Sequence, residues 1–158
     1  MEKKKNLSEV LLSSTETLAG KTVAVITAEW NPGITFSMRD AAVDLLKEYN
    51  PQSILLAEVP GSFELINAAA RLLEEADGLI VIGCVIQGET PHFTFISQAV
   101  ANGIAELNLR SEKPVIFGVL TTNSMEEAKE RAGGKHGNKG VEAAATLVKM
   151  LNLNSRRI

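Results

Sequence analysis

The stretch Gly78–Ile86 (GLIVIGCVI) is apolar from end to end and rich in β-branched residues. A short run of this kind is typical of a strand buried on both faces of a parallel sheet. A glycine turn and the segment Glu89–Phe93 (ETPHF) follow it directly, before a long helical pattern begins. The sequence therefore predicts a buried strand whose carboxyl end opens into a turn and then a helix.

Other runs of β-branched and apolar residues predict three more strands, at residues 22–28, 53–59 and 114–120. Apolar residues at helical spacing predict helices over residues 34–46, 65–73, 96–107, 125–131 and 141–151. Ser62 is expected to cap the second helix, and Ser124 with Glu127 forms a capping box for the fourth. This alternation predicts a single-domain α/β fold, a doubly wound parallel four-stranded sheet of the flavodoxin-like type with helices on both faces.

The composition is that of an ordinary globular domain. A chain of 158 residues with 45% hydrophobic residues can bury one core, and we expect the domain to span residues 21–158. The leader before it, residues 1–20, is weakly patterned and is expected to be disordered or to pack on the sheet of a neighbouring subunit. A net charge of −3 and 4% aromatic residues argue against nucleic acid as a partner.

Location and metal content can also be predicted. Lys3, Lys4 and Lys5 are not followed by an apolar region of signal-peptide length, and no run is long enough to cross a membrane. We therefore expect a cytoplasmic protein with no membrane partner. The single cysteine, Cys84, lies inside an apolar run and is interpreted as a small buried hydrophobic residue, so neither a disulfide framework nor a metal site is expected.

The segments that follow the strands are the candidates for a ligand site, because the carboxyl ends of parallel strands share one rim of a sheet. These segments contain Trp30, Pro60–Glu64, Gly88–His92 and Thr121–Asn123. The backbone N–H groups of the glycine turn suit an anion, and His92 can exchange protons near neutral pH. The alternative is an ordinary turn that carries a surface histidine.

Aromatic residues on the rim have two interpretations. Trp30 either stacks on a flat ring or covers the edge of the core. Phe63 and Glu64 either line a pocket for a planar polar ligand or serve only as a staple residue and a partner of the helix dipole. Their expected position beside Trp30 and His92 favours the pocket.

The segment Arg131–Gly140 (RAGGKHGNKG) is a glycine-rich basic connection between two predicted helices. It does not match the P-loop pattern, because Lys139 is followed by glycine where that motif has serine or threonine. Arg131 and Lys139 either neutralise a phosphate monoester or lie in a solvated connection. His136 is expected to be exposed to solvent, which leaves His92 as the better candidate base.

Taken together, five separated motifs resemble the 6,7-dimethyl-8-ribityllumazine synthase family. The motifs are Trp30-Asn31, VPGSFEL (59–65), GCVIQGETPHF (83–93), PVIFGVLTTN (114–123) and GNKGVEAA (137–144). They occur in the family's order and cover nearly the whole chain from about Gly20 onward. The resemblance implies an enzyme without a cofactor that condenses 5-amino-6-ribitylaminouracil with 3,4-dihydroxy-2-butanone 4-phosphate, releasing phosphate and water, in the penultimate step of riboflavin biosynthesis.

The resemblance also implies a role for each matching residue, with His92 as the group that moves protons. Contacts to the pyrimidine ring and its ribityl chain would come from Trp30, Ser62, Phe63, Glu64, Val85, Ile86 and Phe117. The phosphate would bind at Gly88, Glu89, Thr90 and Arg131, with Lys139 and Glu142 nearby. Sites of this family form between adjacent subunits of a pentamer, so Phe117 and Arg131 are expected from the neighbouring chain.

Two positions depart from the family pattern. Gln87 stands where many members carry arginine, which affects a subunit contact, and Thr94 stands where an acidic residue is common, which leaves His92 without an orienting partner. The short GGKHGNKG connection resembles members whose pentamers form icosahedral shells, and riboflavin synthase is an expected functional partner. Two other functions stay open: a flavodoxin-like module that binds phosphate or flavin without turnover, and a shell protein whose catalysis has lapsed.

Overall fold

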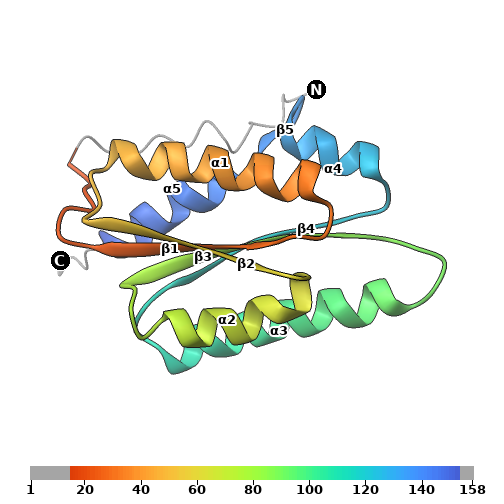
Figure 1. Ribbon diagram of the computed structural model, residues 1–158, viewed down its shortest axis with the longest axis horizontal. Coiled ribbons are helices and arrows are strands. Elements are labelled where there is room, and N and C mark those ends of the chain that lie inside the picture. The colour runs from red at the N-terminus through yellow and green to blue at the C-terminus, as the bar shows by residue number, and fades with distance from the viewer. Residues whose placement is uncertain (1–14, 154–158) are drawn as a thin grey trace, which may run out of the picture.

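The computed structural model describes residues 15–153, which form a three-layered α/β structure (Figure 1). The central sheet contains β1 (Thr22–Ala28), β2 (Ser53–Val59), β3 (Gly78–Ile86) and β4 (Val115–Thr122). All neighbouring strands are parallel, and their order is β2-β1-β3-β4. This order and the helices on both faces confirm the predicted doubly wound, flavodoxin-like fold.

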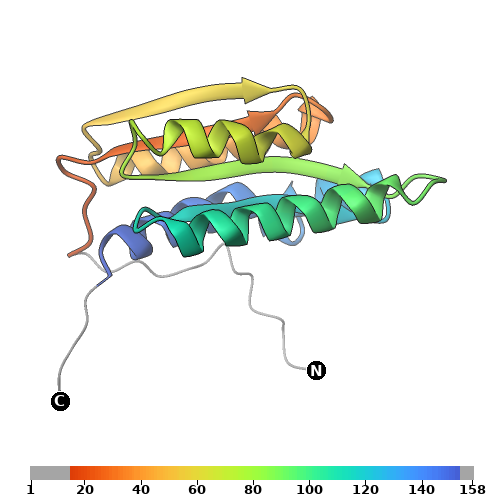
Figure 2. The same cartoon turned by 90° about the horizontal axis from the view of Figure 1, so that it is seen from below.

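Each face of the sheet is covered by a pair of helices. One face carries α1 (Pro32–Glu48) and α5 (Lys139–Leu151), and the other carries α2 (Leu65–Leu72) and α3 (His92–Arg110), as Figures 1 and 2 show. The short helix α4 (Met125–Arg131) lies beside the first turn of α1. Because β3 lies between β1 and β4, its side chains pack into both apolar layers, as its uninterrupted apolar sequence predicts.

The bounds of the first three strands and of α4 are confirmed, whereas α1, α3 and α5 begin earlier than predicted. The helix expected over residues 96–107 runs from His92 to Arg110, so His92 and Phe93, expected in the turn, lie in the first turn of α3. The fourth strand runs on to Thr122, because Thr121 and Thr122 pair with the last two residues of β3. Ser62 does not cap α2; it begins a short 3-10 turn, η2 (Ser62–Glu64), and its side chain is buried. The Ser124 cap is confirmed, since Ser124 Oγ accepts the Glu127 N–H at 3.2 Å.

The connection between α4 and α5 is more regular than its glycine-rich sequence suggests. It forms a small antiparallel hairpin of β5 (Ala132–Gly134) and β6 (Gly137–Asn138). His136 lies at the turn of this hairpin, where it is exposed, as predicted. Its ring lies 3.5 Å from the Glu130 carboxylate.

The end of the predicted leader packs against its own chain. Leu18 is fully buried in the core layer beneath α1 and α5, and its N–H donates to the Tyr49 carbonyl at 2.8 Å. Thr17 N–H donates to the Asn152 side chain at 3.3 Å, which links it to the end of α5. Residues 1–14 and 154–158 lie outside the described part, so the predicted packing of the leader on a neighbouring subunit stays a prediction there.

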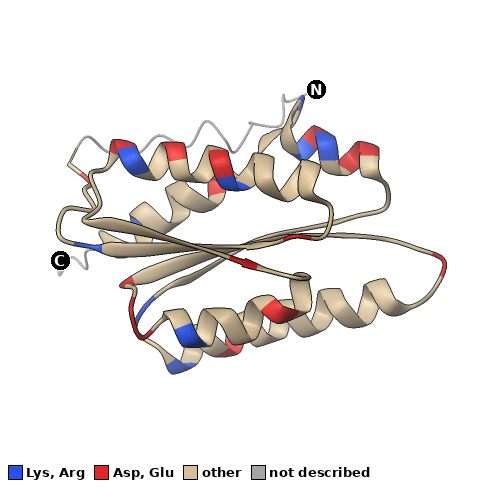
Figure 3. Cartoon of the chain, in the orientation of Figure 1, with Lys and Arg blue, Asp and Glu red and all other residues tan. Residues whose placement is uncertain are grey.

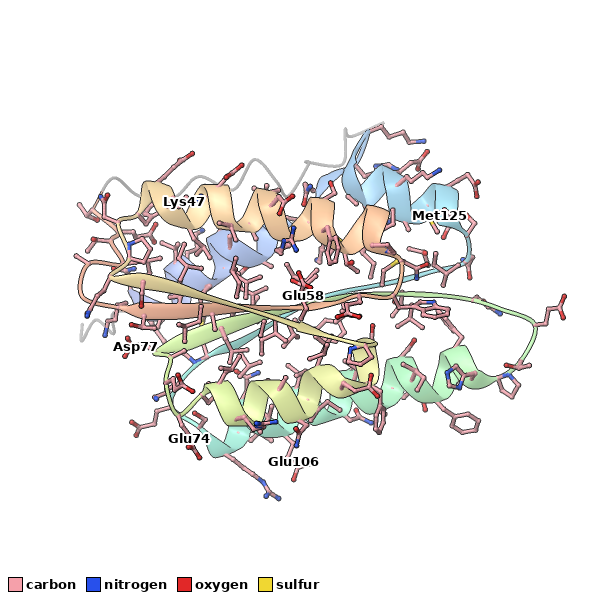
Figure 4. The ribbon with its side chains drawn as sticks, viewed as in Figure 1. Lys47, Glu58, Glu74, Asp77, Glu106 and Met125 are labelled. Carbon is pink, nitrogen blue, oxygen red and sulfur yellow. The ribbon has the colours of Figure 1, made fainter. Side chains whose placement is uncertain are left out.

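Charged side chains are unevenly distributed over the helices. Figure 3 shows that the first half of α3 carries no Lys, Arg, Asp or Glu, whereas α1 and α4 carry many. In Figure 4, Glu58 lies between β2 and α1, where its carboxylate accepts a bond of 3.0 Å from Arg39. Between residues 15 and 153, no helix has both the length and the apolar character that a membrane span requires.

The contact of α5 with α1 at Gly140 provides a test of the fold. A Cβ at Gly140 would overlap the backbone carbonyl of Met38, so α5 can lie against α1 only with glycine here. We expect Gly140→Ala to destabilise the protein by at least about 3 kcal/mol, the upper end of the cost of overpacking, because a backbone atom must move. Urea unfolding followed by circular dichroism measures the loss.

Gly33→Ala is the matched control, because Gly33 lies in α1 and a Cβ there has nothing within 4 Å. It should be neutral or slightly stabilising, as expected for alanine replacing glycine in a helix. Equal midpoints for Gly140→Ala and the parent protein would contradict the packing described for α1 and α5.

Candidate functional site

A cavity with a volume of about 620 Å³ opens at the carboxyl ends of β1, β2 and β3. It lies where α1 leaves the sheet toward one face and α3 leaves it toward the other. Ligands of open α/β sheets bind at this kind of switch in topology. We refer to this cavity as the cleft; its lining consists of Trp30, Asn31, Pro60, Gly61, Ser62, Phe63, Glu64, Cys84, Val85, Ile86, Gly88, Thr90, His92, Phe93 and Ile96.

The cleft exists because the sheet divides into two pairs of strands at this rim. Pairing of β1 with β3 ends at Thr27 and Ile82, although β3 continues for four more residues to Ile86. Beyond that point β1 stays with β2, since the N–H of Trp30 donates to the Pro60 carbonyl at 3.2 Å. On the other side β3 stays with β4, since Gln87 N–H donates to the Thr122 carbonyl at 2.9 Å. The space between the two pairs is the cleft.

Apolar faces line its two sides. Trp30 is 73% exposed and Phe63 is 52% exposed, values far above those of core aromatic residues. The alternative that Trp30 simply covers the core edge is therefore poorly supported, because most of its ring faces open space. Val85 and Ile86 are half-buried at the end of β3 and complete the apolar lining. Exposed rings beside a concave apolar floor suit a flat heterocycle.

Polar groups enter the cleft from the turn after β2. Ser62 is buried, and its hydroxyl lies so close to the backbone of β3 that a Cβ at Gly83 would overlap it. Gly83 is thus the residue that allows the turn to sit against β3. Glu64 ends the 3-10 turn with an exposed carboxylate that also borders the cleft. The Ser62 hydroxyl can donate or accept a hydrogen bond, and the Glu64 carboxylate can accept one, from a polyhydroxylated or amide-bearing ligand.

The opposite end of the cleft consists of the turn between β3 and α3. Gly88 and Thr90 line it, and His92 follows as the first residue of α3. The N-terminus of a helix of this length favours a negative charge, and the Thr90 hydroxyl adds a donor. His92 is exposed, and no side chain between residues 15 and 153 forms a hydrogen bond with its ring. Thr94, two residues along the chain, forms no hydrogen bond with the ring either.

Cys84 also borders the cleft, but its chemistry is not that of a nucleophile. Its side chain is buried as predicted, and burial raises the pKa of the Cys84 thiol to about 11. A thiol with that pKa stays protonated at neutral pH and is a poor nucleophile. What Cys84 offers the site is its backbone carbonyl, which accepts a hydrogen bond of 3.0 Å from the Asn31 side chain.

Several predicted site residues do not line the cleft in a single chain. Phe117, Lys139 and Glu142 line a separate cavity of about 360 Å³ beside β4 and α5. There the Lys139 ammonium lies 3.2 Å from the Glu142 carboxylate. Arg131 is exposed at the end of α4, and Glu89 is exposed in the turn before α3. The part of the cleft that suits an anion therefore has no cationic side chain from its own chain among its lining residues.

Sequence reasoning assigned no site role to some lining residues. Asn31, Phe93 and Ile96 line the cleft, although the sequence only placed them next to Trp30 or in the α3 stripe. The signal for Asn31 was its position between a strand end and Pro32, because an Asn-Pro pair favours the start of a turn. Among the described residues, no group of three His, Cys, Asp or Glu side chains is arranged to hold a metal ion.

The geometry defines what the cleft can do. It offers rings for stacking, a carboxylate and a hydroxyl for recognition, a turn at a helix N-terminus that suits an anion, and an imidazole. Such a set can hold a planar heterocycle beside a phosphate ester and move protons between them. It provides little covalent chemistry, because its thiol is buried and protonated.

Comparison with known proteins identifies the family. The family model described as 6,7-dimethyl-8-ribityllumazine synthase matches residues 20–155. Over 154 residues the chain is 44% identical to the 6,7-dimethyl-8-ribityllumazine synthase of Parabacteroides distasonis, which covers 95% of this chain and 96% of that protein. The protein of the same name from Cytophaga hutchinsonii is 52% identical over 138 residues, covering 85% and 87% of the two chains. That of Thermus thermophilus is 42% identical over 155 residues, covering 96% of each. The motifs, the fold and these relatives lead to one conclusion: the chain belongs to the 6,7-dimethyl-8-ribityllumazine synthase family.

Proposed function

We propose that this protein forms 6,7-dimethyl-8-ribityllumazine from 5-amino-6-ribitylaminouracil and 3,4-dihydroxy-2-butanone 4-phosphate, in the penultimate step of riboflavin biosynthesis. The observation that carries the proposal is the cleft itself, in a chain that belongs to this family. One cavity gathers Trp30, Glu64, His92 and the turn that contains Gly88 and Thr90, although these residues are far apart in the sequence. Each of them matches a chemical need of the two substrates.

The pyrimidine occupies the wide part of the cleft in this proposal. Its ring stacks on Trp30 above Val85 and Ile86, and its ribityl chain runs along the turn from Ser62 to Glu64. Stacking and hydrogen bonds at such an open cleft hold the ring in one orientation. The phosphate ester lies at the other end, against the backbone of Gly88 and Glu89 and the hydroxyl of Thr90.

The reaction then needs proton transfers more than new covalent bonds to the protein. The pyrimidine amine attacks the ketone to form an imine with loss of water, phosphate is eliminated, and ring closure with loss of a second water gives the lumazine. His92, at the start of α3 between the two substrate positions, moves the protons. Holding the substrates together contributes the larger share, because effective molarity lowers a barrier by roughly 7–11 kcal/mol.

We infer that the phosphate charge is balanced from a second chain. The lining of the cleft includes no cationic side chain, whereas Arg131 and Phe117 are exposed away from it. If the site forms between adjacent subunits, the neighbour's copy of Arg131 neutralises the phosphate and its copy of Phe117 closes the pocket. Lys139 and Glu142 lie beside Phe117 and would approach the same site. The assembly proposed is a pentamer.

The family resemblance also supports proposals about shell assembly, a functional partner and the location of the protein. The short hairpin between α4 and α5 is compatible with pentamers that join into an icosahedral shell. Riboflavin synthase, which would consume the product, is the proposed functional partner, and the proposed location is the cytoplasm. No cofactor takes part in the proposed reaction.

The direct test is to mix purified protein with both substrates. Lumazine absorbance should appear together with inorganic phosphate in equal amounts, and neither should form when one substrate is left out. Tight binding of a lumazine or flavin without any product would instead support a binding module. Correctly assembled particles that neither bind nor convert the substrates would point to a shell protein.

Substitutions at the two ends of the cleft should have different effects. His92→Ala is expected to lower kcat by about 10²-fold and leave measurable activity, because a positioned acid or base contributes about 10²–10⁴ in rate. Arg131→Ala is expected to lose more kcat/KM, mainly through a higher KM for the phosphate ester, because a bidentate contact to phosphate is lost. Steady-state kinetics with each substrate varied in turn measures both.

Matched controls exist on the β5–β6 hairpin, where His136→Ala and Lys135→Ala remove the same kinds of group away from the cleft. Both should keep parent activity. A completely inactive His92→Ala protein would overturn the proposed order of importance, as would a normal KM for the phosphate ester in Arg131→Ala.

Mixing subunits tests whether two chains build one site. Co-refolded His92→Ala and Arg131→Ala chains should be more active than the mean of the two variants alone, because some interfaces then combine an intact His92 with an intact Arg131. Light scattering on the parent protein should give at least the mass of a pentamer. If the activity of the mixture does not exceed the mean of the two variants, His92 and Arg131 of one chain serve the same site. Particles no larger than free pentamers would exclude the shell.

A further inference from the structure

Trp30 lies between two cavities. The cleft is on one side, and on the other side is a cavity of about 580 Å³ lined by Glu29, Trp30, Asn31, Pro32, Gly33, Ile34, Met125 and Lys129. The side chain is 73% exposed, so packing against its own chain restrains little of the ring. The position of the indole therefore depends on how firmly the backbone that carries it is held.

That backbone is attached to the β2 side by regular hydrogen bonds. Glu29 N–H donates to the Val59 carbonyl at 2.8 Å, and Trp30 N–H donates to the Pro60 carbonyl at 3.2 Å. On the β3 side the ladder has already ended, at Thr27 and Ile82. Across this gap the side-chain amide of Asn31 donates to the Cys84 carbonyl at 3.0 Å.

Asn31 is at an unusual position for this bond. It is the N-cap residue of α1, where an asparagine side chain normally accepts a hydrogen bond from the first turn of the helix. Here the side chain makes no such cap, and its amide is directed to β3. The backbone carbonyl of Asn31 instead accepts from Ile34 N–H at 3.0 Å and Thr35 N–H at 3.1 Å.

The backbone of Asn31 is left-handed, with φ 60° and ψ 56°. Asparagine adopts this region more readily than most residues other than glycine. The left-handed turn directs the chain from β1 into α1 at the same residue that reaches across to β3. The left-handed backbone of Asn31 and its side-chain hydrogen bond thus both hold the chain next to Trp30.

We propose that Asn31 is a positioning residue of the site, which fixes Trp30 relative to the end of β3 through the Cys84 carbonyl. The stacking ring and the floor of the cleft, Val85 and Ile86, belong to different strand pairs, and the Asn31 amide joins these pairs at the mouth of the cleft. The consequence for catalysis rests on the function proposed above; the effect on the position of Trp30 does not.

The test uses Trp30 as its own reporter, because it is the only tryptophan of the chain. Incorporation of 5-fluorotryptophan gives a single ¹⁹F resonance in the full-length, ligand-free protein. Asn31→Gly keeps the left-handed backbone and removes the amide, and Asn31→Asp keeps the size and removes the donor. Asn50→Gly is the matched control, since Asn50 is also left-handed, with φ 54°, just beyond the opposite end of α1.

The parent protein and Asn50→Gly should give the same narrow resonance. Both Asn31 variants should give a displaced or broadened resonance, because exchange between positions of the ring on the microsecond to millisecond scale broadens the line. Their KM for the pyrimidine should rise about three- to tenfold, the effect of one lost hydrogen bond, while kcat changes less than twofold. Unchanged far-ultraviolet circular dichroism verifies that the variants are folded.

An unchanged resonance in both Asn31 variants overturns the proposal, whatever their activity. If the resonance is unchanged and the KM still rises, Asn31 contacts the substrate directly and does not act through Trp30. Absence of lumazine formation by the parent protein contradicts the proposed function alone, because the ¹⁹F spectra need no substrate.

Discussion

The site depends on the separation of β1 from β3 at one rim of the sheet. Hydrogen bonding between these two central strands ends at Thr27 and Ile82, while each strand keeps its outer neighbour for several residues more. A doubly wound sheet produces this gap because the connections after β1 and β3 leave toward opposite faces. Every group of the cleft borders that gap or covers it. The same topology buries β3 on both faces of the sheet and leaves a cleft at its carboxyl end, where the aromatic residues are exposed.

The fold could be read from the sequence because its signals are local and mutually consistent. Short β-branched runs alternate with helical stripes, and the apolar run of β3 is typical of a central strand of a parallel sheet. Parallel strands then require that Trp30 and His92 share a rim, although they are 62 positions apart in the sequence numbering. The convergence of these residues in one cavity was predictable for that reason.

Features that depend on precise tertiary contact were not predictable in this way. Ser62 has the sequence signature of a helix cap, but its hydroxyl is buried against Gly83, because the turn after β2 lies on β3. The role of Asn31 depends on a carbonyl 53 residues away, which no local pattern specifies. Arg131 and Phe117 carry a clear chemical signal, yet a single chain leaves them outside the cleft. Under the proposed function, their contribution would come from a neighbouring chain.

The distribution of charge fits a cleft that is completed by a second chain. The first half of α3, which follows the turn that contains Gly88 and Thr90, has no Lys, Arg, Asp or Glu. A phosphate ester bound there by backbone groups alone would keep most of its charge unbalanced, and an arginine from outside would relieve that cost. Catalysis would then depend on assembly, since the chain that carries the imidazole would not carry the cation that serves it.

The most direct test of the proposed site is a crystal structure of the assembled protein with 5-amino-6-ribitylaminouracil and inorganic phosphate bound. We expect the pyrimidine ring to be stacked on Trp30 and His92 to lie between the two ligands. The phosphate should lie against the backbone of Gly88 and Glu89, in contact with an Arg131 side chain. A pyrimidine bound away from Trp30, or a phosphate out of reach of His92 and of every copy of Arg131, would contradict the proposed site.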